Sequence, residues 1–128
     1  YIQGRDGQID GVVDAVIEYR DGTTVLDEWK CSKEITSDKT RAYTLQASVG
    51  ALGIAAQNSY AIHRVDIVPV SAPSNTISLG FDNAFEEETR EKLDHIFRDL
   101  RDRKYKPRKG SYCKSCQLKP QCPIWRKR

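Results

Sequence analysis

A short Asp-Gly turn between two β-rich runs constrains the fold of this chain more than any other sequence feature. The run over residues 9–19 is rich in Val and Ile, and Arg20-Asp21-Gly22-Thr23 separates it from a second run, Thr24–Cys31. Asp-Gly between β-rich segments is a strong hairpin signal, because Gly adopts the left-handed backbone conformations that tight turns require. The sequence therefore predicts an antiparallel hairpin near the N-terminus.

The segments that follow alternate between helix and strand. Residues 36–57 are predicted as a helix, residues 61–70 and 76–81 as strands, the second at a sheet edge, and residues 86–104 as a second helix. The face of the first helix expected to lie on the sheet is formed by Ala42, Leu45, Val49, Leu52 and Ala56. This order predicts an α/β domain with a small mixed sheet, flanking helices and a C-terminal cysteine-rich tail.

Length and charge divide the chain into a core and a tail. The 128 residues suit a single domain, with a core over residues 1–104 and a basic tail over residues 105–128 that belongs to the same domain. Residues 1–100 carry 10 Lys/Arg against 17 Asp/Glu, whereas residues 101–128 carry 11 against the single acid Asp102. A basic tail on an acidic body indicates a polyanion as partner, and a merely solvated tail is the alternative.

Nothing in the sequence points to a membrane or to secretion. No apolar run reaches the roughly 20 residues of a membrane helix, and no secretory segment is recognisable, so a cytoplasmic location is expected. The chain opens with Tyr1 and contains no Met, which suggests a piece of a longer polypeptide or a processed chain.

Three cysteines lie inside the basic tail, within a stretch of ten residues. Cys113, Cys116 and Cys122 have the spacing C-x2-C-x5-C, and Cys31 lies more than 80 residues upstream. Without a sign of secretion, metal ligation is a better explanation than disulfides. The thiols suit zinc or an iron–sulfur cluster, and the residues alone do not choose between them.

The hairpin carries the side chains with the clearest chemistry. A turn centred on Asp21-Gly22 places Asp14 opposite Glu28, with Cβ atoms roughly 5 Å apart, and alternation puts Lys30 on the same face as Glu28. Two facing carboxylates repel each other unless a divalent cation such as Mg²⁺ or Mn²⁺ offsets the charge. The ammonium could orient a water or stabilise charge on a phosphate. A solvated acidic hairpin face remains an equal alternative.

These motifs together resemble a known family of nucleases. Gly11-Val12-Val13-Asp14 followed by Glu28-Trp29-Lys30 is similar to the G-x-x-D…(D/E)-x-K signature of the PD-(D/E)XK nuclease superfamily. Gln46 resembles the glutamine of the RecB-type Q-x-x-x-Y motif. The cysteine triplet resembles that of CRISPR-associated RecB-like exonucleases and of helicase–nuclease subunits with an iron–sulfur cluster. The resemblance runs from about Ile9 to Cys122.

The resemblance implies a restriction-endonuclease-like core, here without the family's N-terminal helix, and a role for each motif residue. Asp14 and Glu28 would bind Mg²⁺ or Mn²⁺, with the backbone carbonyl of Trp29 as a further ligand. Lys30 would be the catalytic lysine, and Gln46 would position the DNA or the active site. The three tail cysteines would bind a 4Fe–4S cluster, with zinc as the alternative.

The activity that the resemblance implies is exonucleolytic cleavage of single-stranded or end-containing DNA in repair, recombination or CRISPR adaptation. A helicase or a CRISPR integrase would be the partner in the parent assembly. The alternatives are an inactive nuclease-fold domain that binds DNA or acts as a scaffold, and a small zinc adaptor. The expected DNA-binding side chains are Tyr43, Arg101, Arg103, Lys104, Lys106, Arg108 and Lys109.

Some assignments have rivals. Gly7-Gln8-Ile9-Asp10 also fits G-x-x-D, but the hairpin register would set Asp10 opposite residue 32 or 33, about 13 Å along the strand from Asp14. Asp27 should point to the face opposite Glu28. The tyrosine of the Q-x-x-x-Y motif is replaced by Gly50, and Tyr43 is a possible substitute. Cys31 is expected to be a buried structural thiol.

Overall fold

The predicted hairpin forms around the Asp-Gly turn. In the computed structural model, which describes residues 2–4, 7–58, 61–104 and 106–125, strand β3 (Ala15–Glu18) pairs antiparallel with β4 (Thr24–Lys30). Gly22 has φ 84°, a left-handed conformation that L side chains rarely adopt. The register sets Ala15 opposite Asp27, as an Asp21-Gly22 turn requires.

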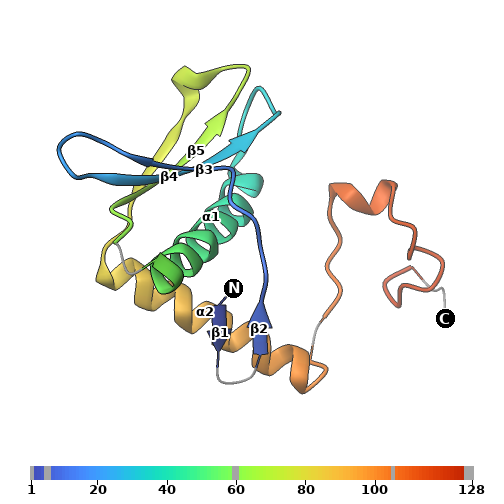
Figure 1. Ribbon diagram of the computed structural model, residues 1–128. Helices are drawn as coiled ribbons and strands as arrows, with labels where there is room; N and C mark the ends of the chain where they lie inside the picture. The colour runs from blue at the N-terminus through green and yellow to red at the C-terminus, as the bar shows by residue number, and fades with distance from the viewer. Residues whose placement is uncertain (1, 5–6, 59–60, 105, 126–128) are drawn as a thin grey trace.

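A four-stranded mixed sheet grows from this hairpin in the order β3-β4-β5-β6. Helix α1 (Ser37–Asn58) connects β4 to the parallel strand β5 (Arg64–Pro69), and β6 (Ile77–Gly80) adds antiparallel at the edge after the 3-10 turn η1 (Pro73–Asn75). Parallel neighbours need a crossover, and α1 provides it on one face of the sheet (Figure 1). The mixed sheet with flanking helices confirms the predicted α/β class and the edge position of the last strand.

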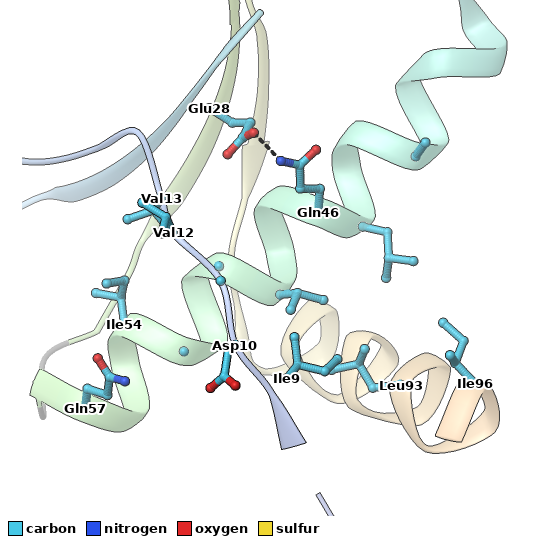
Figure 2. A pocket seen from close by; sticks show the side chains of 16 residues that line it. Ile9, Asp10, Val12, Val13, Glu28, Gln46, Ile54, Gln57, Leu93 and Ile96 are labelled. Atoms are coloured by element: carbon cyan, nitrogen blue, oxygen red, sulfur yellow. Dashed lines mark hydrogen bonds between the residues drawn. The ribbon is translucent and has the colours of Figure 1, made fainter. Parts of the chain in front are cut away.

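The first predicted strand is interrupted, which differs from the expectation for residues 9–19. Strands β1 (Ile2–Gly4) and β2 (Gly7–Ile9) form a separate two-stranded hairpin, and residues 10–14 lead from β2 across α1 into β3 (Figures 1 and 2). A Cβ added at Gly50 would lie 2.8 Å from Val13 Cγ1, closer than such atoms approach. Glycine at position 50 therefore lets the incoming segment cross the helix.

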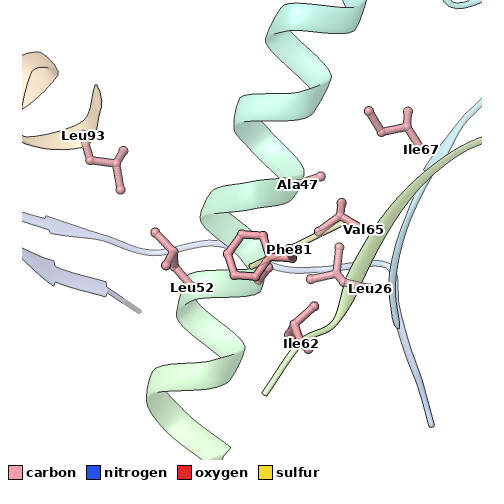
Figure 3. Close-up of a cluster of buried hydrophobic side chains, with 9 residues drawn as sticks. Leu26, Ala47, Leu52, Ile62, Val65, Ile67, Phe81 and Leu93 are labelled. Carbon is pink, nitrogen blue, oxygen red and sulfur yellow. The ribbon is translucent and has the colours of Figure 1, made fainter. Parts of the chain in front are cut away.

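The core lies between α1 and the sheet, but α1 buries a different face from the predicted one. The side chains of Ala47, Ala51 and Leu52 are fully buried, and Ser48 is nearly so. Of the predicted stripe only Leu52 is buried, whereas Ala42 and Ala56 are exposed. Small residues let the helix axis approach the strands closely, so Ala47, Ser48 and Ala51 form much of the face of α1 that is buried most deeply, together with Leu52. Figure 3 shows Ala47 of α1 directed toward the strand residues Val65 and Ile67, and Leu52, on the side of Leu93, belongs to the same buried cluster.

Helix α2 (Asn83–Arg101) begins three residues before its predicted start at Glu86. The side chain of Asp82 accepts a hydrogen bond from the backbone N–H of Phe85 at 2.8 Å and caps the helix. Leu93 of α2 is buried in the core cluster beside α1. The tail follows with the short turn η2 (Ser111–Lys114), and Figure 1 shows it leading away from the sheet. Among the described residues no helix is both long and apolar enough to cross a bilayer.

Candidate active site

A single buried carboxylate organises the side chains at the C-terminal end of β4. Glu28 is 4% exposed, and its Oε1 accepts hydrogen bonds from Lys30 Nζ at 2.5 Å and from Gln46 Nε2 at 2.6 Å. Lys30 Nζ also donates to Gln46 Oε1 at 3.1 Å, which closes a three-membered ring of contacts. Residues two apart on a strand share a face, and α1 places Gln46 next to Glu28 (Figure 2). The structure therefore gathers three of the four predicted catalytic residues.

Tyr43 belongs to the same cluster. It lies three residues before Gln46, on the same side of α1, and Lys30 Nζ is 4.5 Å from the centroid of its ring. A cation over an aromatic face is worth about 0.5–2 kcal/mol, depending on its exposure to solvent. The ammonium group is thus enclosed by a carboxylate, an amide oxygen and a ring. Sequence reasoning offered Tyr43 as a substitute for the missing motif tyrosine, and the structure sets its ring against Lys30.

Asp14 lies beside this cluster at the entrance to the hairpin. Its side chain is exposed, and Oδ2 accepts a hydrogen bond from the backbone N–H of Trp29 at 2.7 Å. The last pair of the β3–β4 ladder is Ala15 with Asp27, and extending this register by one residue sets Asp14 opposite Glu28, as predicted. The N–H and C=O of a strand residue point to the same side, so the carbonyl of Trp29 also faces the edge where Asp14 lies.

Asp10 occupies a place that sequence reasoning missed. The hairpin does not extend to it, so it does not face residue 32 or 33; it follows β2 and lines a cavity that Glu28 and Gln46 also line. Its Oδ1 accepts a hydrogen bond from Gln8 Nε2 at 2.9 Å. The signal available in the sequence was the second G-x-x-D match, which ends at this residue. The structure thus presents two candidate acids, Asp14 next to the motif and Asp10 farther away on the cavity that Glu28 also lines.

The comparison with protein families covers nearly the whole chain. A family model for the PD-(D/E)XK nuclease superfamily matches residues 3–123. The chain belongs to the PD-(D/E)XK nuclease superfamily. A comparison with curated proteins gave no match. Members of this superfamily are generally metal-dependent nucleases, so the matched fold and the Glu28-Trp29-Lys30 motif agree with a nuclease-type function on nucleic acid.

The donor atoms of this PD-(D/E)XK site suit a hard divalent cation. The carboxylates of Asp14 and Glu28 and the carbonyl of Trp29 are oxygen ligands of the kind that Mg²⁺ and Mn²⁺ prefer. Within the described part of the chain, no three His, Cys, Asp or Glu side chains are gathered closely enough to hold an ion by themselves. Mg²⁺ commonly uses one or two carboxylates and completes its shell with water and substrate phosphates, so this small donor set fits it.

A second charged cluster lies on the other face of the nuclease sheet. Asp27 and Asp66 are in register on the parallel strands β4 and β5, and Arg64 Nε contacts both carboxylate oxygens of Asp66 at 2.9 and 3.2 Å. This contact raises the pKa of Arg64. Burial raises the pKa of Asp27, and the charge of Asp66 raises it further. Strand alternation separates Asp27 from Glu28, as the sequence predicted.

The tail cysteines of this superfamily member are not gathered into a metal-binding group in the described residues. Cys113 and Cys122 are half-buried, Cys116 is exposed, and Cys113 Sγ accepts a hydrogen bond from the backbone N–H of Gly110 at 3.3 Å. Cys31 is exposed rather than buried, because β4 ends at Lys30 and leaves it in a bend without strand neighbours. The prediction of a buried structural thiol at Cys31 was wrong.

The basic residues expected to contact DNA begin in the last turn of α2 with Arg101 and continue after the helix. Arg101 and Lys104 contact Asp102 at 3.1 and 3.0 Å, which lowers the pKa of that carboxyl. Further along, Lys109 Nζ and Lys119 Nζ lie 4.5 and 4.6 Å from the Trp125 ring centroid. The predicted DNA-binding cations Arg101, Arg103, Lys104, Lys106, Arg108 and Lys109 are all exposed. Tyr105 and residues 126–128, which also belong to the basic tail, lie outside the described residues.

Proposed function

We propose that the chain is a RecB-like, metal-dependent deoxyribonuclease that acts as an exonuclease on single-stranded or end-containing DNA. The observation that carries this proposal is the buried carboxylate of Glu28, held by the ammonium of Lys30 and the amide of Gln46 at 2.5 and 2.6 Å. A buried ion pair costs desolvation energy and adds little net stability, so its place beside exposed oxygen ligands favours a catalytic role.

Each side chain has a role in this proposal. Asp14, Glu28 and the carbonyl of Trp29 would hold Mg²⁺ or Mn²⁺, which when bound lowers the pKa of water and stabilises charge on the phosphate. Lys30 donates hydrogen bonds to oxygens of the scissile phosphate or of the attacking water. Gln46 fixes the carboxylate and the ammonium relative to each other, because its amide contacts both.

The test compares the chain with its Lys30→Ala variant on single-stranded DNA with Mn²⁺ and with Mg²⁺. Removing a group that stabilises transition-state charge should lower the cleavage rate by roughly 10²–10³-fold. Lys33→Ala, an exposed lysine three residues later, is the matched control and should cleave like the unchanged chain. Equal cleavage by Lys30→Ala and the unchanged chain would contradict the proposal. Strands labelled at the 5′ or the 3′ end, together with circular DNA, separate exonuclease polarity from endonuclease action.

The second candidate is a nuclease-fold domain that binds DNA without cutting it. Gly50 favours this alternative, since the segment that crosses α1 at this point leaves no room for the motif tyrosine. Calorimetry with Mn²⁺ distinguishes the two, because an inactive scaffold has no need of an ion at Asp14 and Glu28. Binding of single-stranded DNA without Mn²⁺ binding or cleavage would support the scaffold.

We further propose that residues 105–128 form a tail that binds a 4Fe–4S cluster through Cys113, Cys116 and Cys122, and that a helicase or a CRISPR integrase is the partner of the parent assembly. Three soft ligands within ten residues support a metal site, and its fourth ligand would come from elsewhere. Iron and zinc analysis with a visible spectrum tests this. Absorbance near 400 nm with bound iron supports the cluster, and zinc alone supports a zinc site.

A further inference from the structure

A cavity of about 570 Å³ opens directly beside the candidate active site. It lies between the segment that crosses α1, the helix α1 itself and the side of α2 that carries Leu93 and Ile96. Glu28 and Gln46 line one end, whereas Asp10 and Gln57 lie toward the other (Figure 2). The cavity is therefore continuous with the cluster that holds the proposed scissile phosphate.

The walls of this cavity are mainly apolar, for a reason found in the packing of α1. The helix buries Ala47, Ala51 and Leu52 in the core, and the apolar or small residues of α1 next to that face line the cavity. These lining residues include Ala42, Leu45, Val49, Gly53 and Ile54. Ile96 across the cavity is 38% exposed, and Val12 on the crossing segment is 93% exposed. Apolar surface left open beside a polar site indicates that an apolar group covers it when the site is occupied.

The charges of the cavity exclude a phosphate. Among the described residues that line it, the ionisable ones are Asp10 and Glu28, both acids, and none is Lys or Arg. Lys30 contacts Glu28 but does not line the cavity. A backbone phosphate is therefore attracted to Lys30 and repelled from the cavity. The group that enters must be neutral, with apolar faces and hydrogen-bond donors at its edge.

We propose that this cavity binds the unpaired terminal nucleobase of the strand whose phosphate lies at Lys30 and Glu28. The inference rests on the proposed nuclease function and specifies its substrate. A nucleobase has two flat, weakly polar faces for the aliphatic walls, and its amino groups can donate to the carboxylate of Asp10 and the amide of Gln57. A base held in a duplex cannot enter without unpairing, so the cavity selects single strands and frayed ends.

The test measures binding without cleavage. Short fluorescent single strands are titrated with the chain in Ca²⁺ in place of Mg²⁺, and anisotropy gives the dissociation constants. One strand is intact, one lacks its 5′-terminal base and one lacks its 3′-terminal base. Removing the base that occupies the cavity should weaken binding by roughly tenfold, since contacts to a single base are worth about 1–3 kcal/mol. Equal binding of all three strands would overturn the base pocket.

Two matched substitutions on α1 localise the effect. Ala42 lines the cavity and Ala56 does not, both are exposed, and Leu is nearly as good a helix former as Ala. Ala42→Leu should bind the intact strand as weakly as the abasic one, whereas Ala56→Leu should keep the difference. Ile96→Asp, which adds a third acid to the cavity, should also abolish the difference in affinity between the intact and the abasic strand. Circular dichroism confirms that each variant is folded.

The outcomes separate this inference from the nuclease proposal. If the chain binds intact ends more tightly than abasic ends but cuts no DNA, the nuclease proposal is refuted and the base pocket is retained. A chain that cuts DNA but binds abasic and intact ends equally, or an Ala42→Leu variant that still distinguishes them, refutes the pocket alone. If Ala42→Leu instead changes the oligomeric state in light scattering, the cavity is occupied by a second copy of the chain, and the base pocket is likewise refuted.

Discussion

The carboxylate of Asp14 accepts a hydrogen bond of 2.7 Å from the backbone N–H of Trp29. Trp29 is the residue that separates Glu28 from Lys30. This bond connects the segment entering the hairpin to the strand that carries the motif. It also brings the carboxylate of Asp14 to the side of β4 toward which the Trp29 carbonyl points. The first acid of the nuclease motif is thus held by the backbone of the second part of the same motif.

We expect Asp14→Asn to weaken Mn²⁺ binding by tenfold or more, because it removes one of two carboxylates from the proposed site. The amide oxygen of asparagine can still accept the Trp29 N–H, so the fold should be kept. Asp10→Asn is the matched comparison and should leave Mn²⁺ affinity nearly unchanged. Isothermal calorimetry measures both. The reverse order of effects would assign the metal site to Asp10.

Removing Gln46 should affect both stability and cleavage. In Gln46→Ala the Glu28 carboxylate loses one of its two side-chain partners, and a hydrogen bond to a charged group is worth about 1.5–3 kcal/mol. We expect urea unfolding to show a loss toward the lower end of that range, since Lys30 remains in contact with Glu28. Cleavage should fall as well. An unchanged unfolding midpoint would show that the amide contact contributes nothing to the folded state.

The ring of Tyr43 should be needed, and its hydroxyl should not. Tyr43→Phe keeps an aromatic face for the Lys30 ammonium, whereas Tyr43→Leu removes it. Since such a contact is worth about 0.5–2 kcal/mol, Tyr43→Leu should lower the cleavage rate by roughly 2–30-fold. Rescue by phenylalanine distinguishes this role from hydrogen bonding to DNA by the hydroxyl. Equal losses in the two variants would contradict it.

Gly50 should tolerate no side chain while Val13 is present. The added Cβ in Gly50→Ala would lie 2.8 Å from Val13 Cγ1, so the crossing segment must shift, and we expect a cost of about 1–3 kcal/mol in unfolding free energy. Combining it with Val13→Ala should recover part of that loss. A double-mutant cycle by chemical denaturation measures the coupling. Additive losses would show that the crossing does not depend on this contact.

Short-range rules were sufficient to predict the hairpin register and the shared face of Glu28 and Lys30. The Asp-Gly turn sets the pairing of β3 with β4, and alternation puts Glu28 and Lys30 on one face. Gln46 was singled out by the family resemblance, and the structure places its amide against both side chains. The placement of Asp10 could not be predicted in this way, because it depends on where the incoming segment crosses α1, which is decided by the fit of Val13 against Gly50 in three dimensions. The predicted stripe missed the buried face of α1 because hydrophobic periodicity gives little weight to small side chains such as Ala47 and Ala51.

The pH dependence of stability should reveal the raised pKa of Asp27. Burial and the neighbouring charge of Asp66 raise its pKa above the usual value near 3.8. The folded chain therefore holds this proton more tightly than the unfolded chain does. Stability from this group is fully present below the unfolded pKa and is lost as pH rises through the folded pKa.

Asp27→Asn should consequently raise the melting temperature at pH 7 and lose that advantage near pH 3.5, where the native carboxyl is protonated. Asp21 is the control, because its bond from the Thr23 backbone N–H lowers its pKa and gives the opposite sign. The stabilisation from the Asp21 carboxylate is present at neutral pH and is lost on acidification, so Asp21→Asn should not raise the melting temperature at pH 7. Circular dichroism melts of the three chains between pH 3.5 and 7 measure the difference. If Asp27→Asn changes the melting temperature by the same amount at every pH, the substitution acts through packing and not through removal of the Asp27 charge.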